Sequence, residues 1–158
     1  MPAASSASLP PLLVFSDPWG RHPSSCQHLI RRLVDRTAVT WVEVIGLRRW
    51  QWTVQNLRRA WEQLRRWWHA TVISAEPSAA PRVLRPLLWP SFRSSWARRF
   101  NTRQFLRGLP TGPEPPVVLT TLPVVADLPG RFPARRWVYY CLDDYAAWPG
   151  WDGPTLRR

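Results

Sequence analysis

The sequence contains no lysine, a single methionine and two cysteines among its 158 residues. All 22 basic residues are therefore arginine, and against 10 acidic residues they give a net charge of +12 at pH 7. A surface this positive attracts anions, so the candidate partners are nucleic acid, anionic lipid headgroups and phosphorylated sugars or nucleotides. A genome-wide base bias also produces such arginine, proline and tryptophan usage, so composition by itself does not establish a function.

Long apolar runs are absent as well. No run approaches the roughly 20 residues that a helix needs to span a bilayer. Residues 1–10 hold no basic stretch, and Leu12–Phe15 is too short to be the apolar part of a signal peptide. We therefore expect a cytoplasmic protein in which residues 1–10 form a flexible N-terminus.

Cysteine and histidine residues do not cluster in the sequence. Cys26 and Cys141 are far apart, and neither belongs to a CxxC motif or to a Cys/His group with zinc-ligand spacing. We predict no metal site and interpret both cysteines as small buried apolar groups, with a single disulfide as the alternative. The sequence also lacks a GxGxxG motif and a Walker A motif, so neither a dinucleotide site nor a P-loop is predicted.

A strand–helix–strand unit is predicted near the N-terminus. Leu12–Phe15 is a short apolar run followed by turn residues, which indicates a buried strand. Ser24 and Gln27 have the spacing of a capping box, and apolar residues then recur at helical spacing up to Val34. Val39–Ile45 is rich in β-branched residues and predicts a second strand. Strand, helix and strand in so short a segment imply a parallel sheet.

The rest of the chain continues this alternation of helices and strands. The further predicted elements are a helix over Thr53–His69, short strands at Val83–Leu84 and Leu87–Trp89, a helix over 92–106, and strands at Val117–Thr121 and Trp137–Leu142. We expect residues 11–147 to form one α/β domain with a mostly parallel sheet. Residues 148–158 are predicted to be a turn-like tail.

Most of the positive charge falls on two of the predicted helices. Residues 48–69 carry six arginines and one glutamate, and residues 92–107 carry five arginines and no acid, so each segment has a net charge of +5. Solvated helix faces, interfacial helices and phosphate-binding surfaces all fit this pattern. Tryptophans at helical spacing favour an anionic membrane surface, and nucleic acid is the less favoured partner because no known nucleic-acid motif is present. The candidate membrane or anion contacts are Arg58, Arg59, Arg65, Arg66, Trp68, Arg98 and Arg99.

Two loops are candidate ligand sites, because ligands of open parallel sheets bind beyond the carboxyl ends of the strands. The first loop follows the predicted strand at Leu12–Phe15 and leads into a helix N-terminus, where free N–H groups favour an anion. Its candidate substrate-binding residues are Asp17, Trp19, Gly20, Arg21, His22, Ser24 and Ser25. The second loop offers Asp143 and Asp144 as candidate catalytic residues, one carboxylate facing the ligand while the other caps or pairs with an arginine. Ordinary turns are the alternative interpretation of both loops.

Four strings of residues, taken together, resemble a known family. They are Trp19–Leu29, Trp41–Gly46, Leu88–Phe92 and Trp137–Tyr145. Their succession is similar to the N-terminal half of bacterial GT-B glycosyltransferases of the group 1, or family 4-like, type, and the similarity runs from about residue 12 to residue 158. The resemblance implies a Rossmann-like domain with helices on both faces of the sheet and strand order 3-2-1-4-5. It also implies that this domain holds the acceptor, an envelope or lipid-linked molecule at the inner face of the membrane.

Two departures from the family bear on activity. Asp143 stands where relatives often carry the histidine of a His-Asp pair, and the donor domain with its paired-glutamate motif has no counterpart in the sequence. The resemblance therefore implies that this chain alone binds no cofactor, that a nucleotide-sugar requires a separate donor domain, and that the chain alone does not turn over. The alternative from a different functional class is a non-catalytic basic module that binds nucleic acid or another anionic polymer.

Overall fold

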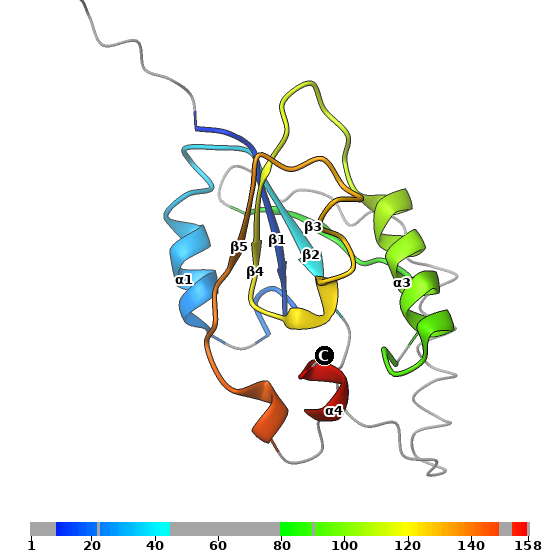
Figure 1. Ribbon diagram of the computed structural model, residues 1–158. Coiled ribbons are helices and arrows are strands. Elements are labelled where there is room, and N and C mark those ends of the chain that lie inside the picture. The colour runs from blue at the N-terminus through cyan, green and yellow to red at the C-terminus, as the bar shows by residue number, and fades with distance from the viewer. Residues whose placement is uncertain (1–8, 22, 45–79, 90, 149–152, 158) are drawn as a thin grey trace, which may run out of the picture.

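Five parallel strands form one sheet at the centre of the molecule (Figure 1). The computed structural model describes residues 9–21, 23–44, 80–89, 91–148 and 153–157. The strands are β1 (Leu12–Ser16), β2 (Val39–Glu43), β3 (Arg82–Leu84), β4 (Val117–Thr120) and β5 (Arg136–Tyr139). Their order across the sheet is β3-β2-β1-β4-β5, and every neighbouring pair is parallel. The predicted α/β class, the parallel sheet and the strand order are confirmed.

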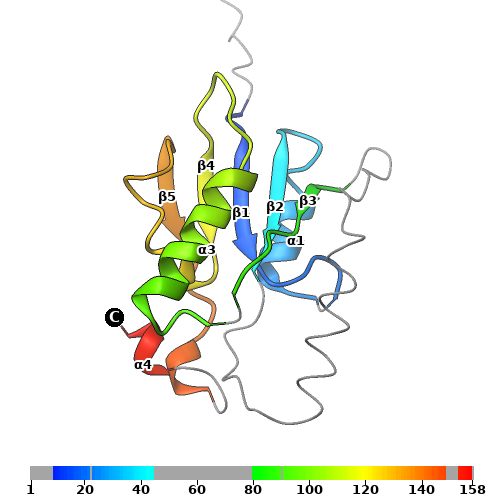
Figure 2. The same ribbon diagram turned by 90° about the vertical axis from the view of Figure 1, so that its right-hand side faces the viewer.

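Helices lie on both faces of this sheet, as predicted. α1 (Ser25–Arg31) covers one face and α3 (Ser95–Gly108) covers the other (Figure 1, Figure 2). The shorter helices are η1 (Pro123–Val125), η2 (Tyr145–Ala147) and α4 (Gly153–Leu156). Within the described ranges, no helix is long and apolar enough to cross a membrane. The helix predicted over Thr53–His69 lies outside the described residues.

The core has a layer on each side of the sheet, because successive side chains of a strand point to opposite faces. On the α1 side, Val14 packs in a buried cluster with Trp41. On the α3 side, Leu13 and Phe15 are buried, and the Phe15 and Phe105 rings meet edge to face with centroids 5.5 Å apart. Burial on both faces explains why the central strands are almost continuously apolar in sequence.

α1 is capped as predicted, but it is shorter than its apolar pattern. Ser24 Oγ accepts the Gln27 N–H at 3.3 Å, which is the first half of a capping box. The Gln27 side chain bonds to the loop after β1 instead of returning to the cap. The helix ends at Arg31, and the chain continues in turns that still leave Val34 half-buried.

The segment that leads into α3 is irregular, so the predicted strand at Leu87–Trp89 is wrong. Its main chain is bound by the buried side chain of Asn101 from α3 instead of by a neighbouring strand. Asn101 Oδ1 accepts the Trp89 N–H at 2.6 Å, and Asn101 Nδ2 donates to the carbonyls of Trp89 and Ser91 at 3.1 and 3.2 Å. One amide side chain thus satisfies main-chain groups that a sheet would otherwise pair.

The two cysteines differ in burial. β5 ends at Tyr139 and does not continue to the predicted end at Leu142, so Cys141 lies beyond the strand. Cys26 on α1 is buried and Cys141 is exposed, and both are free thiols. The predicted burial is therefore confirmed for Cys26 and wrong for Cys141, and the alternative of a disulfide between them does not hold in this structure.

The tail predicted over residues 148–158 contains a short helix. α4 lies against η2, and Leu156 packs on the core layer of the α3 side. A Cβ atom at position 153 would overlap the carbonyl oxygen of Ala146, so the close approach of the two helices depends on Gly153. The tail is therefore only partly turn-like.

Candidate functional site

The carboxyl ends of the strands meet at one edge of the sheet, which we call the carboxyl edge. Because the strands are parallel, Ser16, Glu43, Thr120 and Tyr139 end β1, β2, β4 and β5 on the same side (Figure 1). Two segments follow these ends: the β1 loop, residues 16–20, and the β5 segment, residues 140–148. Ligands of open parallel sheets bind at such an edge.

Hydroxyl groups lead from the core to Asp17. Ser16 and Thr121 are buried, and their side-chain oxygens are 2.8 Å apart. Ser16 Oγ donates to Asp17 Oδ1, also at 2.8 Å. Since a serine hydroxyl has one proton to donate, Thr121 is the donor to Ser16. The Asp17 carboxylate is therefore oriented by a buried relay of hydrogen bonds.

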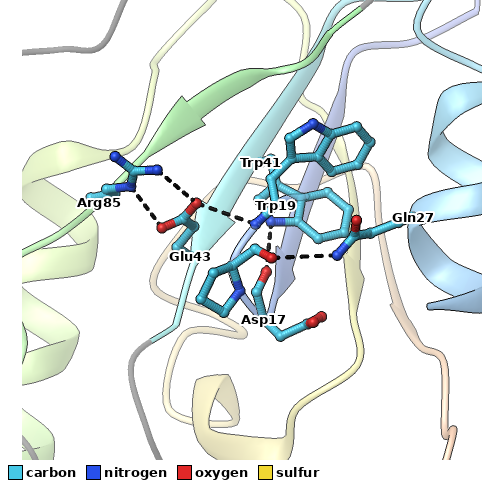
Figure 3. A network of polar contacts seen from close by, with 7 residues as sticks. Asp17, Trp19, Gln27, Trp41, Glu43 and Arg85 are labelled. Carbon is cyan, nitrogen blue, oxygen red and sulfur yellow. Dashed lines mark hydrogen bonds and ion pairs between the residues drawn. The ribbon is translucent and has the colours of Figure 1, made fainter. Parts of the chain in front are cut away.

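An aromatic pair fixes the backbone of the β1 loop (Figure 3). Trp41 Nε1 donates to the carbonyl oxygen of Asp17 at 2.9 Å. The Trp19 and Trp41 rings meet edge to face with centroids 4.7 Å apart. The Arg31 guanidinium lies 5.7 Å from the centroid of the Trp19 ring, in cation–π range. Trp19, which was predicted as a substrate contact, is thus engaged within the protein.

The buried carboxylate of Glu43 ties the β1 loop to β2 and to the segment after β3 (Figure 3). It accepts Arg85 Nε at 2.7 Å, Arg85 Nη2 at 3.2 Å and the Trp19 N–H at 3.2 Å. The hydrogen bond to Glu43 raises the pKa of Arg85. The Glu43 side chain is 7% exposed and that of Arg85 is 50% exposed, so the carboxylate is the buried partner. A buried carboxylate requires such partners, because an unpaired charge in the interior is costly.

Gln27 anchors the same loop from α1. Its side chain is buried, and Oε1 accepts the Gly20 N–H at 3.1 Å while Nε2 donates to the Pro18 carbonyl at 3.4 Å. Gly20 has a φ of 75°, in the left-handed region that favours glycine. The β1 loop is therefore held from α1, from β2 and from the segment after β3, and this fixes the position of Asp17.

Tyr145 of η2 reaches the same place from a distant part of the sequence. Burial raises the pKa of its phenol, and the negative charges of Asp17 and Asp143 raise it further. The phenol therefore stays protonated at neutral pH and can donate a hydrogen bond. An oriented carboxylate and a protonated phenol thus lie within electrostatic range of each other. The edge cluster, as we name it, consists of Ser16, Asp17, Thr121 and Tyr145.

Cys26 is linked to the edge cluster but is not a candidate nucleophile. Burial and the nearby charge of Asp17 raise the pKa of its thiol to about 11, against the lowering effect of a hydrogen bond with Ser16. The thiolate is the reactive form of cysteine, so little of it is present at neutral pH. In the part of the chain that the structure describes, no three His, Cys, Asp or Glu side chains gather as metal ligands.

The structure brings only part of the first predicted loop into the site. Asp17 belongs to the edge cluster, Trp19 packs inside the protein, and Ser24 is the N-cap of α1. His22 lies outside the described residues. The exposed members of the predicted set are Gly20, Arg21 and Ser25.

The two predicted catalytic carboxylates have different surroundings. Asp144 Oδ1 accepts the Ala146 N–H at 3.1 Å and so caps η2, a role that the sequence predicted for one of the pair. Asp143 is exposed, and its charge contributes to the raised pKa of Tyr145. Asp143 is therefore the member of the pair that is available to face a ligand.

Of the predicted membrane or anion contacts, the structure describes Arg98 and Arg99, and the surroundings of these two also differ. Arg98 forms an ion pair with Asp127 at 3.4 Å, whereas Arg99 is exposed on α3. The other predicted contacts lie outside the described residues and are Arg58, Arg59, Arg65, Arg66 and Trp68. Arg98 is thus engaged within the protein, and Arg99 is the described arginine of this set that faces solvent.

Several residues that build the site are not singled out by the sequence. Ser16 and Thr121 stand at the ends of apolar strands, and that position is a signal that could have identified them. Gln27 is visible only as part of a capping box. Glu43 and Arg85 are 42 residues apart, so no local pattern reveals their pairing.

Comparisons with protein-family models, with curated proteins and with solved structures found no match for this chain. The resemblance to GT-B glycosyltransferases therefore remains a prediction. The site is assigned from the geometry of the Asp17 carboxylate, which is oriented at the carboxyl edge of a parallel sheet, and from its effect on the pKa of Tyr145.

Proposed function

We propose that the chain is the acceptor-binding domain of a GT-B glycosyltransferase, which transfers a sugar from a nucleotide-sugar to a cell-envelope or lipid-linked acceptor. The parallel sheet with the order β3-β2-β1-β4-β5 supports this proposal, as does the position of the β1 loop at the carboxyl edge. The observation that carries the proposal is the Asp17 carboxylate at the carboxyl edge, which Ser16 and Thr121 orient and whose charge raises the pKa of Tyr145.

The chemistry of the edge cluster suits a sugar hydroxyl. A hydroxyl both donates and accepts hydrogen bonds, so a complementary site needs an acceptor and a donor close together. The Asp17 carboxylate accepts, and the protonated Tyr145 phenol donates. In the proposed complex the acceptor hydroxyl donates to Asp17 and accepts from Tyr145. Arg21, exposed just after the same loop, offers a cation for the phosphate of a lipid-linked acceptor.

Sugar transfer requires the hydroxyl to lose its proton. Its oxygen attacks the anomeric carbon of the donor sugar, and the bond between that carbon and the nucleotide phosphate breaks. The proton passes to a base within hydrogen-bond reach, and Asp17 is the proposed base, with Asp143 as the second carboxylate near Tyr145. The nucleotide-sugar would be held by a donor domain of the kind found in the family. This chain alone is therefore proposed to bind the acceptor without turnover.

Ligand-observed NMR with simple glycosides tests this proposal. The probes are methyl glucoside, methyl mannoside and methyl N-acetylglucosaminide, because the edge cluster does not specify one sugar. We expect the native chain to bind at least one of them weakly. Asp17→Asn should weaken that binding about tenfold, since it removes the charge while its side-chain oxygen still accepts from Ser16.

The matched control is Asp35→Asn, which removes an exposed carboxylate in the turns after α1. It should leave glycoside binding unchanged. Equal loss of binding in the two variants, or no binding of any glycoside by the folded native chain, would contradict the proposal. Hydrolysis of UDP-glucose by the purified chain would contradict the part that assigns donor binding to another domain.

The second candidate function is a non-catalytic module that binds nucleic acid or another anionic polymer. Residues 80–113 favour it, because this segment contains seven arginines and no acidic residue. Among these arginines, Arg85 and Arg98 form ion pairs within the protein. Salt-sensitive binding of duplex DNA, together with no response to any glycoside, would favour this function over the first.

A further inference from the structure

Two exposed aromatic side chains and a half-buried one gather at the start of α3. Trp89 and Trp96 are 47% and 57% exposed, and their rings meet edge to face with centroids 5.1 Å apart. Phe100, one turn after Trp96, stacks on it with centroids 6.0 Å apart and planes inclined by 18°. We name Trp89, Trp96 and Phe100 the aromatic cluster. Exposed apolar side chains that gather in this way mark a surface that meets a partner.

The aromatic cluster is held in place by the protein. Asn101, buried on the opposite face of α3, bonds both the N–H and the carbonyl of Trp89. Ala97 and Phe105 are buried on that same face, so the turns that carry Trp96 and Phe100 are fixed to the sheet. The cluster is therefore a preformed surface, which lowers the entropy lost when a partner binds.

Arginines accompany the aromatic cluster on the outer face of α3. Arg99 and Arg103 follow Trp96 by three and seven residues, a spacing that places them on the same side of a helix. Both are exposed, whereas Arg98 pairs with Asp127. This surface is therefore aromatic and positively charged, which selects an anionic partner.

We infer that the aromatic cluster, with Arg99 and Arg103, is a docking surface for an anionic lipid bilayer. Tryptophan is enriched at the headgroup level of membranes, and arginine beside it attracts anionic lipids. Nucleobases need free ring faces for stacking, and fewer remain here because Trp96 and Phe100 cover one face of each other and Trp89 meets Trp96 edge to face, so lipid is the better match. This inference goes beyond the proposed function, because binding a bilayer requires no sugar chemistry.

The docking surface lies at the same end of the molecule as the edge cluster. α3 runs antiparallel to the strands, so its first turn lies toward the carboxyl edge (Figure 2). A bilayer bound through Trp96 would thus be close to the candidate acceptor site. Lipid-linked molecules embedded in that bilayer would have a short path to Asp17.

Co-sedimentation with lipid vesicles tests the inference. The probes are vesicles of phosphatidylcholine alone and vesicles of phosphatidylcholine mixed with phosphatidylglycerol. We expect the native chain to sediment with the mixed vesicles and much less with the neutral ones. The double variant Trp96→Ser/Phe100→Ser and the double variant Arg99→Gln/Arg103→Gln should each weaken binding to the mixed vesicles about tenfold.

The controls remove similar groups from the opposite side of the sheet. Arg32→Gln/Arg36→Gln deletes the same charge from exposed positions at the end of α1 and just beyond it, and Leu29→Ser deletes an exposed apolar side chain from α1. Both controls should keep native binding, and circular dichroism should show the native helix content in every variant.

Equal sedimentation with neutral vesicles would overturn the inference, as would equal losses in the test and control variants or no loss in either test variant. The last result would also place vesicle binding elsewhere in the chain. Single-stranded DNA that binds through Trp96 while vesicles do not bind would overturn it in favour of nucleic acid. Glycoside binding to Asp17 is measured separately, so the two proposals fail independently.

Discussion

The β1 loop and the β5 segment lie at the same edge of the sheet but are held in different ways. Side chains from other elements bind the β1 loop, namely Gln27 from α1, Trp41 and Glu43 from β2, and through Glu43 the guanidinium of Arg85. Within residues 141–148 of the β5 segment, the main-chain hydrogen bonds are short-range. The N–H groups of Tyr145, Ala147 and Trp148 donate to the carbonyls of Asp143, Asp144 and Tyr145, and the Ala146 N–H donates to Asp144 Oδ1.

This difference has a consequence for the edge cluster. A loop bound by distant partners opens only when those partners separate, whereas a segment with local bonds opens at a lower free energy. Asp17 therefore has a fixed position, and Tyr145 depends on the packing of η2 against α4 and the core. A ligand at this edge would therefore contact the rigid β1 loop on one side and the more mobile β5 segment on the other.

The largest effect is expected from Glu43→Ala, which removes the carboxylate that anchors the β1 loop. The Trp19 N–H loses its acceptor and Arg85 loses its ion-pair partner. Because the Arg85 side chain is half exposed, water partly replaces the lost ion pair. We expect the free energy of unfolding to fall by about 2–3 kcal/mol. Urea denaturation followed by fluorescence measures this change in the free energy of unfolding.

The control for this variant is Glu114→Ala. Glu114 pairs with Arg135 at 3.9 Å, and both side chains are at least 50% exposed. A surface pair of this kind contributes less than about 1 kcal/mol. Similar destabilisation by the two variants would show that the buried Glu43 carboxylate stabilises the protein no more than an exposed ion pair does.

Gln27→Ala is expected to have the next largest effect. It leaves the Gly20 N–H and the Pro18 carbonyl without their side-chain partner, while the N-cap bond to Ser24 involves the main chain and persists. We expect a loss of about 1–2 kcal/mol in the same denaturation experiment. Gln104→Ala on the half-buried side of α3 is the matched control, and an equal loss there would argue against a special role for Gln27.

The β5 segment should respond more weakly. Asp144→Ala removes the side-chain cap of η2, and the expected cost is about 0.5–1 kcal/mol. The change should be local, so hydrogen exchange of the Ala146 amide should accelerate more than that of the β1 amides. Asp143→Ala is the control, since its carbonyl accepts the Tyr145 N–H through the main chain. Equal acceleration in β1 would show that the two segments open together.

The fold could be predicted from the sequence because its signals are local. β1 and β2 have buried side chains on both faces of the sheet, and such strands are continuously apolar whatever their neighbours are. The strand at Leu87–Trp89 is a wrong prediction for the same reason. An apolar run of that length is also satisfied by an irregular segment when a distant side chain, here Asn101, bonds its main chain.

The candidate site could be predicted only in part. Asp17 follows a strand, and that position identifies it. The same position makes Trp19 a predicted substrate contact, although its ring packs against Trp41 within the protein. The ring partner of Trp19 is Trp41, which is 22 residues away and belongs to β2, a strand whose sequence is typical of an ordinary buried strand. The effect of the Asp17 charge on the pKa of Tyr145 likewise depends on how β5 is placed across the sheet, which no local pattern encodes.

The smallest effect on stability at neutral pH is expected from Asp17 and Tyr145 of the edge cluster, and it is measured by titrating the Tyr145 phenol. Burial first, and then the charge of Asp17, raises the pKa of Tyr145 above the ordinary value of about 10. The unfolded chain therefore releases this proton first. The contribution of Tyr145 to stability is complete below about pH 10 and is lost as the pH rises through the folded pKa.

Absorbance of the phenolate separates the contributions of burial and charge. Tyr145→Phe identifies the Tyr145 signal by subtraction, because Tyr139 also has a pKa raised by burial. In Asp17→Asn the pKa of Tyr145 should fall but stay above its ordinary value, since burial remains when the charge is gone. Asp35→Asn should leave it unchanged. An unchanged pKa of Tyr145 in Asp17→Asn would mean that the β1 loop and the β5 segment do not interact electrostatically. The edge cluster would then lose Tyr145 as its hydrogen-bond donor.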